Sequence, residues 1–260
     1  MNEAPSPALE ATLVTLLGLL LGSFMNVCIY RLPRGGSPVR PRSGCPSCGH
    51  MLAWFENVPV LSYLVLRGKC RSCGAGISPM YPIIESITGA MFLAGYLWYG
   101  PSALLVVRLL FGCAMIVLFV IDLQHRILPN IITIPGIVVG FLLSEVAGPG
   151  WVASLIGIAA GAGGLFAISE VYYRVRHEEG LGMGDVKMLG MIGAFLGWKL
   201  VILTLVLSSV AGSVFSLAIL AARKGSLKSA LPFGTFLAIG ALVAAVAGDP
   251  LVNWYLQYFQ

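Results

Sequence analysis

Two aspartates stand where apolar stretches meet polar ones, and this makes them the first candidates for chemistry. Asp122 follows the apolar run that ends in Phe119-Val-Ile, and Asp185 follows Gly182-Met-Gly. An acidic side chain at a membrane span is costly, so it indicates function. Two facing carboxyl groups share one proton, so one can take a proton from water while the other polarises a carbonyl group. The pair predicts aspartic peptidase chemistry, with Asp122 and Asp185 as the catalytic residues.

Each aspartate also has a purely structural interpretation. Asp122 can pair with Arg126, which is four residues further along a helix. Asp185 can pair with Lys187, or it can cap the helix that follows, a position that Asp favours. We favour the catalytic interpretation because the predicted topology places both carboxyl groups at the same membrane boundary.

Four residues are weaker candidates for contact with a substrate or with the aspartates: Gly182, Gly184, Lys187 and Glu85. The two glycines would let the backbone approach a substrate strand closely. Glu85 lies near the start of an apolar segment. There it can neutralise the positive end of the helix dipole, or it can line a substrate groove.

Four of the six cysteines form two CxxC motifs, Cys45-Pro-Ser-Cys48 and Cys70-Arg-Ser-Cys73. Each motif places two thiolates on one tight turn, and two such turns can enclose Zn²⁺ in a tetrahedron. Four sulfur ligands leave no open position, so this zinc would be structural. The alternatives are two disulfides, four free thiols or a redox site. A reducing cytoplasm argues against the disulfides.

The composition excludes a soluble domain. Only 10% of the 260 residues are charged, whereas a soluble domain carries roughly 25%. The hydrophobic fraction is 58% and the mean hydropathy is +0.90. We therefore predict an all-α polytopic membrane protein with a small zinc-binding insert. About eight spans are expected, at 11–30, 81–99, 102–121, 131–148, 151–170, 186–198, 200–222 and 231–248.

Glycines recur at four-residue spacing within these segments and predict closely packed helices. The pairs are Gly18/Gly22, Gly136/Gly140, Gly157/Gly161 and Gly193/Gly197.

The basic residues predict the orientation of the chain. With the N-terminus outside, 14 of the 16 Lys and Arg lie in inside loops, and only Arg108 and Lys199 lie outside. The net charge of +5 is then a topology signal that favours anionic lipid, and it requires no nucleic acid. We divide the chain into a first span (1–30), a cytoplasmic Cys-rich insert (31–80) and a transmembrane peptidase domain (81–260).

Five motifs together resemble the prepilin peptidases, the type IV leader peptidase and N-methyltransferase family. The similar segments are Gly22–Pro33, Leu61–Pro82 together with the paired CxxC of the insert, Ile121–Asn130, Gly182–Lys187 and Leu231–Gly234. In this resemblance Asp122 and Asp185 match the two catalytic aspartates. The family pattern departs at Gln124 and Asn130, where many relatives carry acidic residues.

The resemblance implies a bacterial inner-membrane enzyme whose active site faces the cytoplasm. Its substrates would be type IV prepilins or type II secretion pseudopilins, cleaved after a Gly to remove a short basic leader. S-adenosylmethionine would then methylate the new N-terminus. If the first insert carries that activity, the weak candidates are Gly22, Asn26, Arg31 and Glu85.

Two other classes of function remain open at this point. A proton-coupled transporter would also use intramembrane acids, but it predicts inverted repeats and acids at the midplane. A thiol redox carrier would use the cysteines instead of the aspartates.

Overall fold

The computed structural model describes residues 6–177, 182–222 and 232–258. Within these ranges every named element is a helix, and the only β pairing is two isolated bridges, Gly44 with Met51 and Lys69 with Gly76. The predicted all-α class is confirmed. The chain forms two compact units, Met1–Leu109 and Leu110–Gln260. The domain boundaries at residues 30 and 80 stay a prediction.

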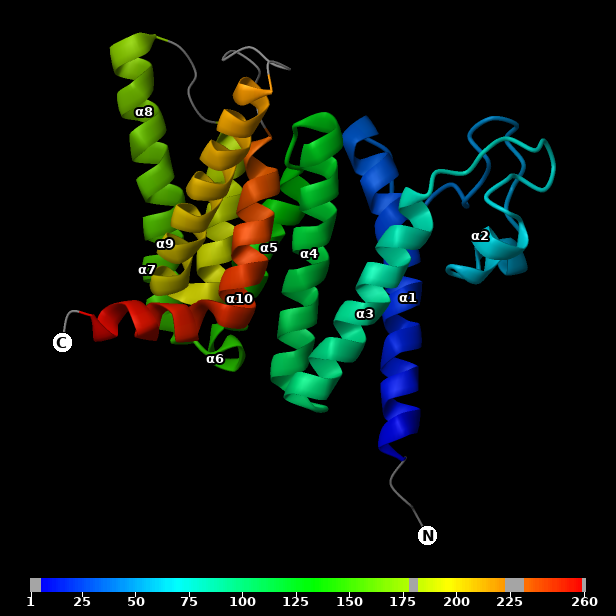
Figure 1. Ribbon diagram of the computed structural model, residues 1–260, viewed down its shortest axis with the longest axis horizontal. Coiled ribbons are helices and arrows are strands. Elements are labelled where there is room, and N and C mark those ends of the chain that lie inside the picture. Colours follow the sequence, from blue (N-terminus) through cyan, green and yellow to red (C-terminus); the bar gives the residue numbers. More distant parts are fainter. Residues whose placement is uncertain (1–5, 178–181, 223–231, 259–260) are drawn as a thin grey trace. The chain divides into compact units, whose positions relative to one another are not determined.

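The first unit is built on two long helices that pack against each other, α1 (Pro7–Arg31) and α3 (Met80–Tyr99). Ser6 caps α1 by accepting the Leu9 N–H. Between the two helices the chain forms the insert, whose helical elements are η1 (Leu32–Arg34), η2 (Trp54–Asn57) and α2 (Leu61–Val65). In Figure 1 the insert projects to one side of α1 and α3.

Glycines set the distance between α1 and α3, as their spacing predicted. A Cβ atom on Gly18 would come 2.7 Å from the Phe92 side chain, and one on Gly22 would come 2.8 Å from the Glu85 backbone. These contacts are too short for any side chain, so only glycine permits this approach.

The second unit is a bundle around one long helix, α9 (Met183–Ala221), which packs against α5, α7 and α10. The other elements are α4 (Ala103–His125, which begins in the first unit), α5 (Asn130–Leu142), α6 (Ser144–Ala147), α7 (Gly150–Ile158), the π-helical η3 (Ala159–Gly163), α8 (Gly164–Arg176) and α10 (Phe233–Gln257). The predicted glycine packing recurs here. A Cβ on Gly161 would lie 2.6 Å from the Leu189 carbonyl oxygen, and one on Gly140 would lie 2.6 Å from the Phe195 ring.

Helix α9 is interrupted at Gly197, whose φ of 77° and ψ of 175° are not helical. The sequence predicted two spans here, 186–198 and 200–222, and the break falls within the first of them, one residue before its predicted end. Helix α10 contains Pro250, which lacks the N–H that a helix interior needs. Its red C-terminal turns run across the direction of its first part in Figure 1.

Five helical segments in the described residues are long and apolar enough to cross a membrane: 7–34, 103–125, 150–176, 183–221 and 233–257. The prediction of a multi-pass helical membrane protein is confirmed, whereas the count of eight spans stays a prediction. Arg223, Lys224, Lys228 and Leu231, which entered the charge and motif arguments, lie outside the described residues.

Candidate active site and cysteine cluster

Asp122 lies near the end of α4, and its carboxylate is held by the start of α10. Its side chain is buried, with the residue 5% exposed. One oxygen, Oδ2, accepts two hydrogen bonds from Thr235, from the backbone N–H at 2.7 Å and from the hydroxyl Oγ1 at 3.0 Å. Helices α4 and α10 therefore fix the position of this carboxylate together.

Asp185 is the third residue of α9 and is half-buried. Its own N–H donates to the Gly182 carbonyl oxygen at 3.0 Å, and the Gly182 N–H donates to its carboxylate. The carboxyl groups of Asp185 and Asp122 are close enough for their charges to interact. The structure thus brings the two predicted catalytic aspartates, 63 residues apart in the chain, into one site.

Leu128 lies between the starts of α9 and α10. A Cβ on Gly184 would come 3.0 Å from Leu128 Cβ, and one on Gly234 would come 2.9 Å from Leu128 Cδ1 and 3.0 Å from Asp122 Oδ2. Both glycines therefore make room for neighbours that belong to the site. The direct contact of Gly182 and Gly184 with a substrate stays a prediction.

Neither ion pair of the structural alternatives, Asp122 with Arg126 or Asp185 with Lys187, is formed among the described residues. Lys187 donates to the side-chain oxygen of Asn130 at 2.9 Å. Gly182 is the N-cap residue of α9, and Asp185, three residues later, accepts its N–H. Among the described residues the ion pairs are Glu170 with Arg174 and His50 with Glu56, so Asp122 bonds to Thr235 and not to Arg126.

Glu85 belongs to the first unit, where it is buried and accepts the Val60 N–H at 2.8 Å. The buried Asn26 donates to the Tyr81 carbonyl oxygen at 3.1 Å, and Arg31 donates to carbonyl oxygens of the insert. Asn26 thus ties α1 to α3, and Arg31 and Glu85 tie the insert to these two helices. Their part in methylation stays a prediction.

The four CxxC cysteines lie together in the insert, with all Sγ atoms within 4.8 Å of one another. Two equivalent turns present them. The Gly49 N–H donates to the Cys45 carbonyl oxygen and the Gly74 N–H to that of Cys70, both at 2.9 Å. Gly49 and Gly74 have φ of 71° and 72°, which glycine adopts without strain.

The cluster has the dimensions of a tetrahedral metal site. Zn–S bonds of about 2.3 Å in a tetrahedron place sulfurs roughly 3.8 Å apart. The Sγ atoms of Cys45 and Cys73 are 3.9 Å apart, and those of Cys48 and Cys70 are 4.0 Å apart. Hydrogen bonds from the backbone N–H groups of Cys48 and Ser47 lower the pKa of Cys45 to about 6, which favours the metal-binding thiolate. These four residues can hold a metal ion.

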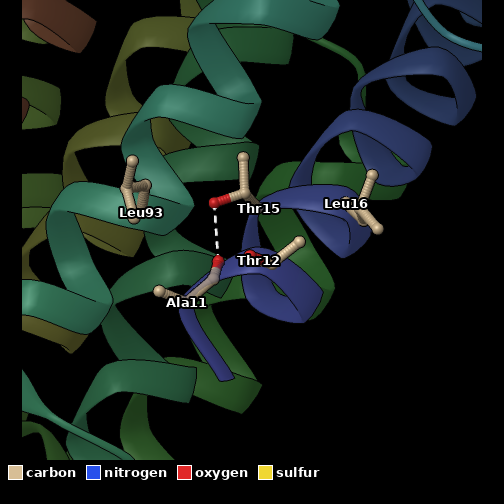
Figure 2. Close-up of a pocket in the computed structure, with 5 residues that line it drawn as sticks. All are labelled: Ala11, Thr12, Thr15, Leu16 and Leu93. Atoms are coloured by element: carbon tan, nitrogen blue, oxygen red, sulfur yellow. Dashed lines mark hydrogen bonds between the residues drawn. The ribbon is translucent and has the colours of Figure 1, made fainter. Parts of the chain in front are cut away.

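A shallow pocket on the first unit does not belong to this chemistry. It lies between α1 and α3 and is lined by Ala11, Thr12, Thr15, Leu16 and Leu93. Figure 2 shows the Thr15 hydroxyl turned back onto the Ala11 carbonyl oxygen, a bond of 2.7 Å. None of the lining side chains titrates, so the pocket offers neither an acid nor a base.

Thr235 is the residue of the site that the sequence argument missed. It directly follows the Leu231–Gly234 motif and opens an apolar helix, where a small polar residue is easily explained as a helix start. The useful signal was the motif itself, because its last residue, Gly234, is where α10 approaches the Asp122 carboxylate closely.

Known proteins match this chain along nearly its whole length. The model described as the bacterial peptidase A24 N-terminal domain matches residues 16–99, and the model described as the type IV leader peptidase family matches residues 109–217. No solved structure matches the chain.

Curated relatives carry the name prepilin leader peptidase/N-methyltransferase. The protein from Pseudomonas putida is 36% identical, over 98% of this chain and 96% of the relative. That from Pseudomonas aeruginosa is 35% identical, over 94% and 92%. That from Myxococcus xanthus is 41% identical over 82% of this chain, and the match spans 64% of that relative's length. The chain therefore belongs to the type IV leader peptidase family.

Proposed function

We propose that this protein cleaves the basic leader from type IV prepilins or type II secretion pseudopilins, after a Gly, by an aspartic mechanism. The observation that carries the proposal is that the Asp122 and Asp185 carboxyl groups, at the end of α4 and the start of α9, are close enough for their charges to interact. Family membership and the names of the relatives support prepilin processing.

The reaction needs one ionised and one protonated carboxyl group. The ionised carboxylate takes a proton from water, and the water oxygen attacks the scissile carbonyl carbon. The protonated carboxyl group donates to the carbonyl oxygen, so no oxyanion is left uncompensated. Transfer of a proton to the leaving nitrogen then releases the leader.

Methylation of the new N-terminus by S-adenosylmethionine is the second proposed activity. It is supported by the relatives' printed name, prepilin leader peptidase/N-methyltransferase. Gly22, Asn26, Arg31 and Glu85 remain the candidates for that site, because they lie where the insert joins α1 and α3.

Zinc is the proposed ion of the cysteine cluster, since four sulfur ligands at tetrahedral spacing suit it best. Its role would be to hold the two CxxC turns together, because four thiolates leave it no open coordination position.

The proposed location is the bacterial inner membrane, with the insert and the aspartates at the cytoplasmic face. The asymmetry of the basic residues supports this orientation, and the five long apolar helices support the membrane itself.

The direct test incubates the purified protein with a prepilin peptide, with and without S-adenosylmethionine, and reads the products by mass spectrometry. We expect loss of the leader in both reactions and a gain of one methyl group only with the methyl donor. An intact peptide in both reactions would contradict the proposal.

A further inference from the structure

Thr235 makes the two aspartates of the site unequal. Both of its donors, the backbone N–H and the hydroxyl, reach the same atom, Asp122 Oδ2. Hydrogen bonds donated to a carboxylate favour its charged form, and two donors on one oxygen also fix the plane of the carboxylate. The other oxygen, Oδ1, is then the atom that can accept a proton from water.

The charges around the two aspartates also favour the ionised form of Asp122 over that of Asp185. Arg126 attracts the negative charge of Asp122, whereas Asp185 faces that charge and, among the described residues, accepts the Gly182 N–H. Both carboxyl groups are removed from water to some degree, so a single shared charge is the stable arrangement. These contacts place that charge on Asp122 and the proton on Asp185.

We propose that Thr235 is a positioning residue that makes Asp122 the general base and leaves Asp185 as the general acid. This assignment rests on the proposed function and deepens it. Thr235, through its two hydrogen bonds to Asp122, determines which of the two aspartates acts as the base.

The test compares Thr235→Val, Thr235→Ala and Thr235→Ser in the prepilin peptide assay, with the full-length protein. Valine keeps the shape of threonine and alanine is smaller, but both lack the hydroxyl donor, whereas serine retains it. One hydrogen bond to a charged group accounts for roughly 10-fold to 100-fold in rate. We expect kcat to fall by that factor for the valine and alanine variants, with KM nearly unchanged, and to be restored by serine.

Wild-type kcat in a folded valine or alanine variant would overturn the assignment, and so would a serine variant as slow as valine. A change confined to KM would also overturn it, because that would mean a contact with substrate. Asp122→Asn is run beside them. If that variant still cleaves, the proposed function itself fails, and the two failures are therefore distinguishable.

A second inference concerns the insert of the first unit, which carries an exposed apolar surface. Its members are Trp54, Phe55, Leu61, Leu64 and Val65, and Trp54 and Val65 are 81% and 79% exposed. The Ser62 hydroxyl, bonded to the carbonyl oxygens of Phe55 and Val58, ties η2 to α2. The five side chains therefore belong to one local structure, which we call the insert surface.

The insert surface lies at the level where α3 enters its apolar part. The Val60 N–H, directly before α2, donates to Glu85 at 2.8 Å. Glu85 is five residues past Met80, the first residue of α3, which corresponds to about 7.5 Å along a helix. α2 is thus anchored beside α3, the segment predicted from the sequence as the span 81–99, less than two turns from its first residue.

The charge of the insert fits an anionic partner. Arg67, Lys69 and Arg71 follow α2 and are exposed. The only acidic residue within 31–80 is Glu56, which is buried and accepts the Ala53 N–H. A basic prepilin leader would be repelled by this charge, whereas anionic lipid headgroups would be attracted. We infer that the insert surface lies in the headgroup region of an anionic bilayer.

The position of the insert surface in the bilayer is tested by the fluorescence of Trp54 in the full-length protein, reconstituted in nanodiscs. The signal of Trp54 is the difference between wild type and Trp54→Phe, and the quenchers are lipids brominated in the acyl chain and iodide in the water. We expect the brominated lipids to remove most of the Trp54 signal, and iodide to remove little. Quenching should be stronger with phosphatidylglycerol than with phosphatidylcholine alone.

Quenching by iodide and not by brominated lipid would overturn the inference. Protection that appears only when a prepilin peptide is added would overturn it as well, because the surface would then bind substrate. Equal quenching in both lipid compositions would contradict the part played by the basic side chains. Val65→Trp in the Trp54→Phe protein repeats the measurement from α2, and zinc content confirms that the insert is folded.

Discussion

At the scale of single residues, the site depends on the small space around the Asp122 carboxylate. Oδ2 already accepts two hydrogen bonds, and Gly234 lies against the same oxygen. Gly234→Ala would place a methyl group 3.0 Å from Oδ2 and 2.9 Å from Leu128 Cδ1. A shift of this size in a catalytic group costs on the order of 10²-fold in rate. We expect such a loss in kcat in the prepilin peptide assay.

The matched control is Gly164→Ala, because a Cβ at Gly164 meets no atom within 4 Å. It should cleave at the wild-type rate. If both variants were equally active, the close approach of Gly234 to the carboxylate would have no catalytic importance.

The sequence singled out the aspartates but not their partner. Carboxylates are rare in so apolar a chain, so Asp122 and Asp185 were conspicuous. Thr235 was not, because threonine is unremarkable at a helix start. Its role follows from a contact across 113 residues, and neither spacing nor composition carries that information.

At the scale of elements, the paired CxxC turns form a unit that a metal would complete. Cys70 is the most buried of the four ligands, and Cys70→Ser removes one thiolate from the cluster. We expect the metal content, measured by elemental analysis, to fall from one zinc per chain to nearly none. The insert should also become more sensitive to limited proteolysis, because the metal holds two loops together.

Cys28→Ser is the control, since Cys28 lies in α1, away from the cluster, and should retain the zinc. Undiminished zinc in Cys70→Ser would rule out the four-sulfur site. If the wild type bound no zinc and Cys70→Ser still lost activity, the redox interpretation of the cysteines would be favoured.

The break in α9 is a second element on which the fold depends. Gly197 has φ of 77°, and a Cβ there would come 2.9 Å from Pro149. The backbone strain of a non-glycine residue in this region costs roughly 1–3 kcal/mol, and the clash adds to it. Gly197→Ala should lower the Tm by a few degrees in a thermal unfolding experiment.

Gly212→Ala lies further along the same helix and serves as its control. The nearest atom to a Cβ there is on Phe236 at 3.6 Å, an ordinary contact. A Tm for Gly197→Ala equal to that of Gly212→Ala would mean that the break tolerates any residue.

At the scale of the whole molecule, the charge distribution predicts how the chain crosses the membrane. Fourteen of 16 basic residues fall on one side when the N-terminus is outside. Alkaline phosphatase fused after residue 71 should therefore be inactive, and fused after residue 100 it should be active. Fusions to green fluorescent protein should show the reverse pattern. Activity of the first phosphatase fusion would place the insert on the outer side.

Hydropathy predicts the class of this fold well, because lipid requires every span to satisfy its backbone polar groups within a helix. The predicted segments correspond to helices, including the division of α9 near residue 198. Hydropathy does not predict the π-helical turn at 159–163 or the change of direction within α10 (Figure 1). Which helices approach through their glycines also required the three-dimensional structure, because any face of an apolar helix can meet another.

The most direct test of the central claim is the cleavage of a prepilin peptide by Asp122→Asn and by Asp185→Asn. Both variants should be purified as folded proteins that retain the metal of the insert. General acid–base catalysis contributes roughly 10²-fold to 10⁴-fold, so each variant should lose at least about 10²-fold in kcat. Cleavage by either variant at the wild-type rate would contradict the assignment of Asp122 and Asp185 as the catalytic pair.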